Sequence, residues 1–335
     1  MIKKYIYNNI IFIFIFLFLR KIFSFFFRHK GFSKKDKIIN SPEQISKIIS
    51  NYIKSNKPFF VGRLGAHEIN IIENYFGTKK KKISLIKFLL RKNPEWFWHK
   101  RKMKYFKNNA GFFPLKEEYL KKYSVDTLNC FKQVDLHGFT QTTYSIYKSI
   151  GNHYKFKKVI KCNLKYLEPY LSKNPWSRFL KNKTVLVIHP FSKSIESQYK
   201  NKRKVIFSDQ GVLPKFKLKT IKSIQLIGDK DEKFKNWFEA LEHMKRKIDQ
   251  TKFDIAIIGC GAYGFNLGAY IKQKGKSAIH LGGATQILFG IKGRRFENPR
   301  HYNGFYLKLF NNAWVRPHLK EKPTGFSKIE NGAYW

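Results

Sequence analysis

The chain has 335 residues, of which 67 are Lys or Arg and 22 are Asp or Glu, so its formal net charge is +45 at pH 7. This length allows one large or two modest domains, and the charge predicts attraction to phosphates in nucleic acid, anionic lipid or a nucleotide-linked substrate. Cys130, Cys162 and Cys260 lack C-x-x-C spacing, which argues against a disulfide framework or a zinc site and fits a reducing cytoplasm.

Residues 1–38 differ in composition from the rest of the chain. Residues 10–19 are wholly apolar, Arg20 and Lys21 follow, and residues 22–27 form a second apolar block. A spanning helix needs ~20 apolar residues, about twice the first run, and no A-x-A-like cleavage site follows it. We expect this segment to anchor the chain on the anionic, cytoplasmic face of the cell membrane, with a single span and a buried helix as the alternatives.

The predicted α/β domain covers residues 39–335 and opens with a helix over residues 42–54. Ser41 is a good N-cap for this helix, and Pro42 is a good first helical residue. Residues 59–61 then have the composition of a short strand, which leads into a polar turn.

This turn, residues 62–68, precedes a second predicted helix over residues 68–75. Arg63 is suited to a bidentate grip on a diphosphate, and Glu68 is a candidate to hold a metal or to take a proton. The structural alternatives are a salt bridge for Arg63 and compensation of the helix dipole for Glu68.

Residues 79–82 and 87–107 are dense in cations, and the second stretch includes Trp96, Trp98 and Tyr105. Basic residues with interleaved aromatics can stack nucleic-acid bases, but an amphipathic surface with a basic face is the favoured interpretation. A further helix is expected over residues 115–131.

A second polar strand end follows a buried strand predicted at residues 185–188. His189 is a candidate general base, with a purely structural histidine as the alternative. Ser194 and Gln198 are candidate hydroxyl and amide donors to a ligand. Two more elements are predicted beyond this point, a strand over residues 224–227 and a long helix over residues 232–250.

The clearest local pattern is a βαβ unit over residues 254–281. An apolar run ends at Gly259-Cys260-Gly261-Ala262-Tyr263-Gly264, a helix follows, and Gly275 precedes a second apolar run. The helix N-terminus favours an anion, and the spacing matches G-x-G-x-x-G. A dinucleotide site also needs an acidic residue at the end of the second strand, where this chain has His280, Leu281, Gly282 and Gly283. We therefore favour a phosphate-bearing ligand over NAD, with tight helix packing alone as the structural alternative.

The carboxyl ends of parallel strands share one edge of a sheet, where open α/β proteins bind their ligands. We predict a Rossmann-like, mostly parallel sheet with helices on both faces, preceded by a membrane-associated apolar helix. Glu68 and His189 are the expected catalytic groups. The residues expected to contact the ligand are Arg63, Gly65, Ser194, Gln198, Gly259, Gly261, Tyr263, Gly264, His280, Gly282, Gly283, Lys292 and Arg294.

The element Arg63-Leu64-Gly65-Ala66-His67-Glu68 and the later DIAIIGCGAYG…GKSAIHLGG unit resemble the GT-D type of glycosyltransferase domain of bacterial polysaccharide and glycoprotein assembly. The resemblance implies transfer of a sugar from a nucleotide-sugar donor to a growing bacterial surface glycan. Family members with Asp-x-Glu in this element bind a divalent metal, Mn²⁺ or Mg²⁺. Glu68 matches the Glu, whereas Ala66 stands at the Asp position, so the resemblance implies at most Glu68, with His67 beside it, as metal ligands.

A glycan on a lipid carrier is the acceptor that would account for both the basic surface and the apolar N-terminus. Three other classes stay open at this point: a membrane-associated nucleic-acid-binding protein, an NAD-dependent oxidoreductase, and a scaffold without catalysis. Nucleic acid is the less favoured partner.

Overall fold

The fold is built on one seven-stranded sheet in which every strand pair is parallel, in the order β3-β2-β1-β7-β6-β4-β5. The computed structural model describes residues 9–26, 32–80, 82–90, 92–224, 233–322 and 326–335. The strands are β1 (Phe60–Arg63), β2 (Leu136–Phe139), β3 (Ile160–Asn163), β4 (Thr184–His189), β5 (Lys217–Lys222), β6 (Ile255–Ile258) and β7 (Ser277–His280). The predicted parallel α/β architecture is confirmed.

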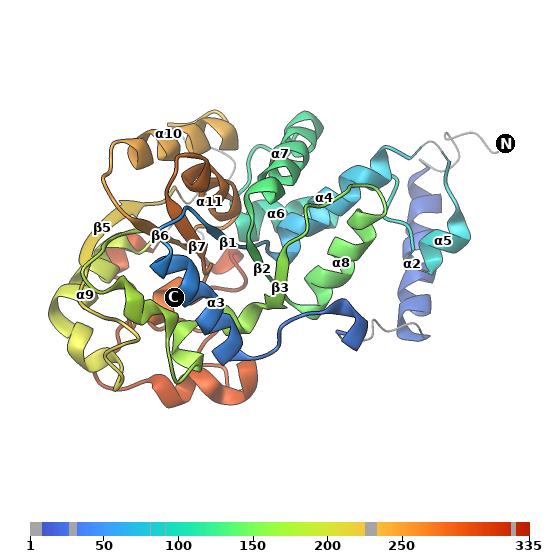
Figure 1. The fold of residues 1–335 in the computed structure, drawn as a ribbon. Coiled ribbons are helices and arrows are strands. Elements are labelled where there is room, and N and C mark those ends of the chain that lie inside the picture. Colours follow the sequence, from blue (N-terminus) through green and yellow to red (C-terminus); the bar gives the residue numbers. More distant parts are fainter. Residues whose placement is uncertain (1–8, 27–31, 81, 91, 225–232, 323–325) are drawn as a thin grey trace.

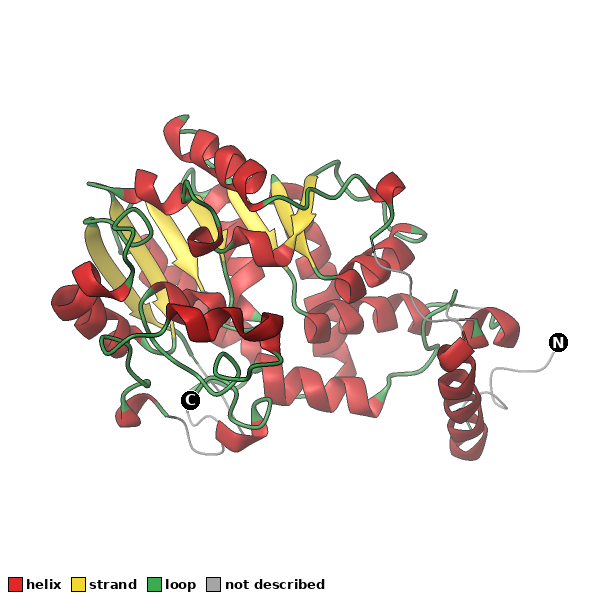
Figure 2. Cartoon of the chain, turned by 90° about the horizontal axis from the view of Figure 1, so that it is seen from below, coloured by secondary structure: helices red, strands yellow, loops and turns green. Residues whose placement is uncertain are grey.

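Helices cover both faces of this sheet (Figures 1 and 2). They are α2 (Ile10–Phe26), α3 (Pro42–Lys54), α4 (Ala66–Thr78), α5 (Leu85–Leu89), α6 (Lys100–Ala110), α7 (Glu117–Cys130), α8 (Gln141–Gly151), α9 (Ser192–Ile206), α10 (Trp237–Asp249), α11 (Tyr263–Gln273) and α12 (Ala284–Leu288). Short 3-10 segments include η3 (Leu164–Leu167), η6 (His301–Leu309) and η7 (Leu319–Glu321).

The two faces form separate apolar cores because side chains alternate across each strand. In β4, Leu186 and Ile188 enter a core with α4, α7, α10 and α11, whereas Val185 and Val187 enter a core with α3, α9, α12 and the C-terminal segment. The β6 residues are divided in the same way. A strand buried on both faces needs a continuous apolar run, which is the pattern seen at residues 255–258 and 185–188.

Most predicted elements are confirmed within a few residues, including α3, whose N-cap Ser41 accepts a hydrogen bond from the N–H of Gln44. The strand predicted at residues 224–227 lies outside the described residues except for Ile224, which follows the fifth strand, β5, without being part of it. The helix predicted over 232–250 begins at Trp237, after the Asn236 cap, and residue 232 also lies outside the described residues. Strands β2, β3 and β5 were not predicted.

The N-terminal apolar residues form a single helix, α2, at the end of the molecule away from β5 and α9 (Figures 1 and 2). Arg20 and Lys21 therefore interrupt the sequence of apolar residues without interrupting the helix. Among the helices that the structure describes, none is both long and apolar enough to cross a membrane.

Gly77 marks a close approach between α4 and the loop that carries Glu95. A Cβ atom at Gly77 would collide with the backbone carbonyl of Glu95, the same oxygen that accepts a hydrogen bond from Asn74 Nδ2 at 3.1 Å. We expect Gly77→Ala to lower the free energy of unfolding by roughly 1–3 kcal/mol, because backbone must move to admit the methyl group. Denaturant unfolding checks this.

Gly151→Ala is the matched control, since Gly151 also ends a helix but a Cβ atom there would meet nothing within 4 Å. This control should leave stability unchanged or raise it by about 0.4–1 kcal/mol. Equal effects at the two glycines would contradict the assignment of a close backbone contact to Gly77.

Candidate functional site

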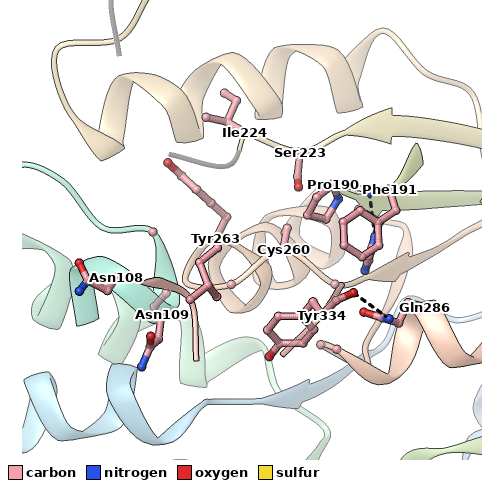
Figure 3. Close-up of a pocket in the computed structure, with 18 residues that line it drawn as sticks. Asn108, Asn109, Pro190, Phe191, Ser223, Ile224, Cys260, Tyr263, Gln286 and Tyr334 are labelled. Carbon is pink, nitrogen blue, oxygen red and sulfur yellow. Dashed lines mark hydrogen bonds between the residues drawn. The ribbon is translucent and has the colours of Figure 1, made fainter. Parts of the chain in front are cut away.

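A cavity of about 90 Å³ lies at the carboxyl edge of the sheet, between the ends of β4 and β6 (Figure 3). After β4 the chain passes through α9 to β5 on one side, and after β6 it passes through α11 to β7 on the other. The connections after β4 and β6 thus leave in opposite directions, and the gap between these two strand ends is a topological switch point, where α/β sheets bind ligands. The lining residues are Asn108, Asn109, Ala110, Gly111, His189, Pro190, Phe191, Ser223, Ile224, Gly259, Cys260, Gly261, Tyr263, Gly282, Gly283, Gln286, Ile329 and Tyr334.

Glycines bring backbone unusually close to backbone around this cavity. A Cβ atom at Gly259 would lie 2.5 Å from the carbonyl oxygen of Gly282 and 2.7 Å from Thr285 Oγ1. Gly261 has φ +55°, a backbone conformation that favours glycine. A Cβ atom at this position would also lie only 2.7 Å from the carbonyl oxygen of Ala110, so a larger residue would not fit.

Several polar groups that face the cavity have no partner within the described part of the chain. They include the backbone N–H groups of Cys260 and Gly261, at the positive N-terminal end of α11. Ser223 Oγ and Gln286 Oε1 are also buried without a hydrogen bond among the described residues, and Figure 3 shows the Ser223 hydroxyl directed into the cavity. Because buried polar atoms are normally satisfied, these groups mark a place for a polar ligand.

His189 lines the cavity with only one of its ring nitrogens available. Its Nδ1 accepts the N–H of Phe191 at 3.0 Å, and burial lowers the pKa of the imidazole to about 3. The ring is therefore neutral at pH 7 with its proton on Nε2. This geometry favours a hydrogen-bond donor over the general base expected from the sequence.

Arg63 and His280 lie directly behind the cavity wall. Arg63 Nη1 donates to the carbonyl oxygen of Leu281 at 3.2 Å, and a Cβ atom at Gly282 would lie 2.8 Å from that nitrogen. His280 Nδ1 bonds the carbonyl oxygen of Arg63 at 3.0 Å, and its other ring nitrogen packs against Gly264. These contacts join the ends of β1 and β7, so the loops after β1, β4, β6 and β7 lie at one edge as expected.

Glu68 belongs to the same region but does not line the cavity. Its carboxylate folds back against Gly65 at the start of α4. Burial raises the pKa of Glu68, opposed in part by its own backbone N–H and by the charges of His67 and Arg63. Burial raises the pKa of Tyr334, which does line the cavity, and the charge of Glu68 adds a smaller contribution in the same direction.

A metal site at Glu68 and His67 is not supported by the arrangement of their side chains. His67 Nε2 is 3.0 Å from Asn109 Nδ2 and 4.0 Å from Glu330 Oε1, while Glu68 is turned toward Gly65. Within the described ranges of the chain, no group of three or more His, Cys, Asp or Glu side chains could hold a metal ion.

Ser194 and Gln198, predicted as ligand donors, are instead bonded within the protein. The Glu321 carboxylate from η7 accepts the N–H groups of Lys193 (2.7 Å) and Ser194 (3.1 Å) and the Ser194 hydroxyl. Gln198 Nε2 donates to the carbonyl oxygens of Gly290 and Ala313, at 3.1 and 2.9 Å. The anion-binding N-terminus of α9 is thus already filled by a carboxylate of the chain itself.

Lys292 and Arg294 do not line the cavity either; Lys292 Nζ lies over the ring of Phe310, and Arg294 Nη1 bonds the carbonyl oxygen of Asn331 at 3.4 Å. The neighbouring Arg295, which sequence reasoning missed, donates to Tyr334 OH at 2.9 Å and pairs with Glu330. Arg295 thereby fixes Tyr334 in the cavity wall.

Other wall residues that the sequence did not single out are Asn109, Ser223, Gln286 and Tyr334. They come from α6, the end of β5, α12 and the C-terminal tail, and none carries a local motif. For Tyr334 the sequence offers one signal, since aromatic residues at the end of a chain are typical of a tail that packs back onto its domain.

Glu168, just after η3, is a second buried carboxyl at this edge of the sheet. It accepts hydrogen bonds from Tyr170 OH at 2.6 Å and from Tyr306 OH at 2.8 Å. Burial raises its pKa to about 7, although both tyrosine hydroxyls and the charge of Arg63 oppose the shift. The carboxyl is therefore close to half-protonated at neutral pH.

Fold and site together define an all-parallel, doubly wound α/β domain with a polar cavity at its switch point. The chain is similar to two solved structures of domain of unknown function 1792. One is selenomethionine-substituted, with TM-score 0.39 and 14% identity over 95% of this chain and 94% of that one. The other, described as having a distinct glycosyltransferase fold, gives TM-score 0.36 and 12% identity over 91% of this chain and 96% of that one.

No family model and no curated protein matches the chain. Likeness to the two solved structures at this level does not bear on activity, so the function is argued from the site.

The raised pKa of Glu168 makes stability depend on pH. The folded protein holds this proton up to about pH 7, whereas the ordinary pKa is 4.5. The contribution is therefore fully present below pH 4.5 and is lost as pH rises through 7, by roughly 3 kcal/mol in total. Glu168→Gln should remove this fall, as measured by denaturant unfolding between pH 4.5 and 8; an unchanged pH profile in the variant would contradict the assignment.

Proposed function

We propose that this chain is a glycosyltransferase that binds the diphosphate of a nucleotide-sugar donor in the cavity between β4 and β6. The observation that carries the proposal is a set of donors that have no partner among the described residues: the N–H groups of Cys260 and Gly261 at the N-terminal end of α11, and the Ser223 hydroxyl. Backbone N–H groups at a helix N-terminus are a common phosphate site. Gln286 Oε1 adds an acceptor suited to a sugar hydroxyl.

The size of the cavity supports binding of part of the donor inside and part outside. A volume of about 90 Å³ corresponds to roughly three water molecules at the ~30 Å³ that each occupies in the liquid, which is room for a phosphate group of the donor. The rest of the donor would extend outward past the half-buried Ile224 and Asn108. His189 Nε2–H would donate to the ligand, and Arg63, one layer behind, would add positive charge.

The transfer step needs a bond made, a bond broken and a place for one proton. The acceptor hydroxyl oxygen bonds the anomeric carbon, the bond from that carbon to the diphosphate oxygen breaks, and the nucleoside diphosphate leaves with its electron pair. We assign Glu68 as the group that takes the hydroxyl proton, because it is a buried carboxyl in the first turn of α4, at the same edge of the sheet as the cavity, and burial raises its pKa. The acceptor is a growing bacterial surface glycan, with a lipid-linked glycan as one form.

The alternatives receive less support. An NAD enzyme needs a carboxylate at the end of β7, where the chain has His280 and Gly282. Base stacking by the basic stretch would need free aromatic rings, yet Trp96 is buried against Phe88, and the exposed Tyr105 hydroxyl bonds the Arg101 guanidinium.

Ser223→Ala tests the cavity directly, because it removes one hydroxyl without adding volume. We expect the dissociation constant of the donor to rise roughly 2- to 12-fold, the range for one lost hydrogen bond. Calorimetric titration with UDP- and GDP-linked hexoses, free UDP, pyrophosphate and NAD⁺ measures this.

Ser197→Ala, an exposed serine on α9, is the matched control and should leave affinity unchanged. Binding of NAD⁺ with no binding of nucleotide sugars would favour an oxidoreductase. Failure of every nucleotide and of pyrophosphate to bind would refute the proposal.

Glu68→Gln should keep donor affinity within about twofold and lower transfer by roughly 100-fold or more, as expected for loss of a general base. The rate of the unaltered protein should rise with pH through a pKa above 4.5, because burial raises the pKa of Glu68. Release of nucleoside diphosphate with an added oligosaccharide acceptor measures both effects.

Glu73→Gln is the control on the same helix, since Glu73 is another carboxyl whose pKa burial raises but it contacts Lys102. It should retain the rate. Full activity of the Glu68 variant would remove Glu68 from the mechanism.

A further inference from the structure

One side of α2 carries a set of exposed apolar side chains, of which Phe14 and Phe18 also line an open hollow between α2 and helices α4, α6 and α8. We call this set the α2 stripe; it consists of Ile10, Ile11, Phe14, Ile15, Phe18 and Ile22. Phe14 is 72% exposed and Phe18 58% exposed. Their spacing places them on one face of a helix about 25 Å long. Soluble surfaces rarely show so many adjacent large apolar side chains without a partner.

The opposite side of α2 is fixed to the domain by a buried ion pair. Arg20 Nη1 donates to Glu95 Oε1 at 3.0 Å, and the guanidinium lies 4.3 Å from the ring centroid of Phe88. Lys102 Nζ bonds the other oxygen of Glu95 at 2.8 Å. Arg20, which divides the apolar residues in the sequence, is thus turned inward, so the α2 stripe is left without a charge in its middle.

Cations surround this helix. Lys21 is exposed at the margin of the α2 stripe, and the adjacent α5 carries exposed Ile86 and Lys87, with Lys82 and Lys92 exposed on its flanks. A second copy of a chain with net charge +45 would bring like charges together at such a contact. An apolar face bordered by lysines instead complements the surface of a lipid bilayer, whose acyl interior is apolar and whose headgroups can be negatively charged.

We propose that the α2 stripe docks this protein on an anionic lipid surface, with its six apolar side chains in the headgroup–acyl boundary and the neighbouring lysines on the headgroups. The Arg20–Glu95 pair fixes α2 to the domain and leaves the α2 stripe exposed. This inference does not depend on the proposed activity, because it concerns a surface at the other end of the molecule from β4 and β5 (Figure 1).

The test is flotation of the full chain with preformed vesicles of phosphatidylcholine, with and without phosphatidylglycerol. Wild-type protein should float with the anionic vesicles and at least roughly tenfold less with neutral ones. Phe14→Asp with Phe18→Asp should lower partitioning to anionic vesicles by roughly tenfold or more, since two large apolar side chains lose their burial. Val205→Asp with Leu319→Asp, an identical charge change at two exposed apolar sites elsewhere, should lower it less than twofold.

Circular dichroism establishes that both double variants fold, and Phe14→Ser with Phe18→Ser replaces the aspartates if they do not. Equal losses in the two double variants would mean that overall charge alone drives binding, and would overturn the role of the α2 stripe. Light scattering without lipid supplies the other decisive result. A wild-type dimer that the Phe14 and Phe18 substitutions convert to a monomer would assign the α2 stripe to a second copy of the chain.

Discussion

The close approach of backbone to backbone beyond the ends of β6 and β7 is the constraint on which the candidate site depends. Side chains at Gly259 or Gly282 would occupy the space now filled by a carbonyl oxygen and by the Arg63 guanidinium, respectively. Because Gly259 and Gly282 have no side chains, the loops after β1, β6 and β7 can pack as one layer. The same packing leaves the N–H groups of Cys260 and Gly261 facing the cavity without a backbone partner among the described residues. Space for a ligand and the donors to hold it therefore arise from one feature.

The strands that the sequence predicted well are those whose residue types directly reflect their burial. β4 and β6 are central strands buried on both faces, so continuous apolar runs mark them. β3 and β5 lie at the two edges of the sheet, where exposed lysines interrupt the apolar pattern, as in Lys217–Lys222. β2 is central, but it is four residues long and places His137 between the rings of Phe131 and Phe139, which no propensity scale would favour. Tertiary packing decides these strands.

The same distinction, between local sequence signals and tertiary packing, applies to the residues of the candidate site. Residues that follow central strands, such as His189, Gly259 and Gly261, could be placed at one edge from the sequence, because the carboxyl ends of parallel strands share an edge, and the structure has them in the cavity wall. The bond from Ser194 to Glu321 could not be predicted, because the two residues are 127 positions apart and no local pattern indicates that a distant carboxylate occupies a helix N-terminus. Tyr334 was missed for the converse reason, since it reaches the cavity only when the C-terminal tail docks and Arg295 holds it.

The groups that attract phosphate-bearing ligands to the protein differ from the groups that select among those ligands. Burial lowers the pKa of His137, His189 and His280 to about 3, and the nearby Arg63 adds to the effect for His137 and His280. These histidines therefore add no positive charge around the site at neutral pH, although the chain as a whole carries +45. Surface lysines and arginines supply a long-range field that draws in phosphates of any kind and that salt weakens. Discrimination among those phosphates must then come from the uncharged donors in the cavity, whose fixed directions accept one geometry and which salt screens far less.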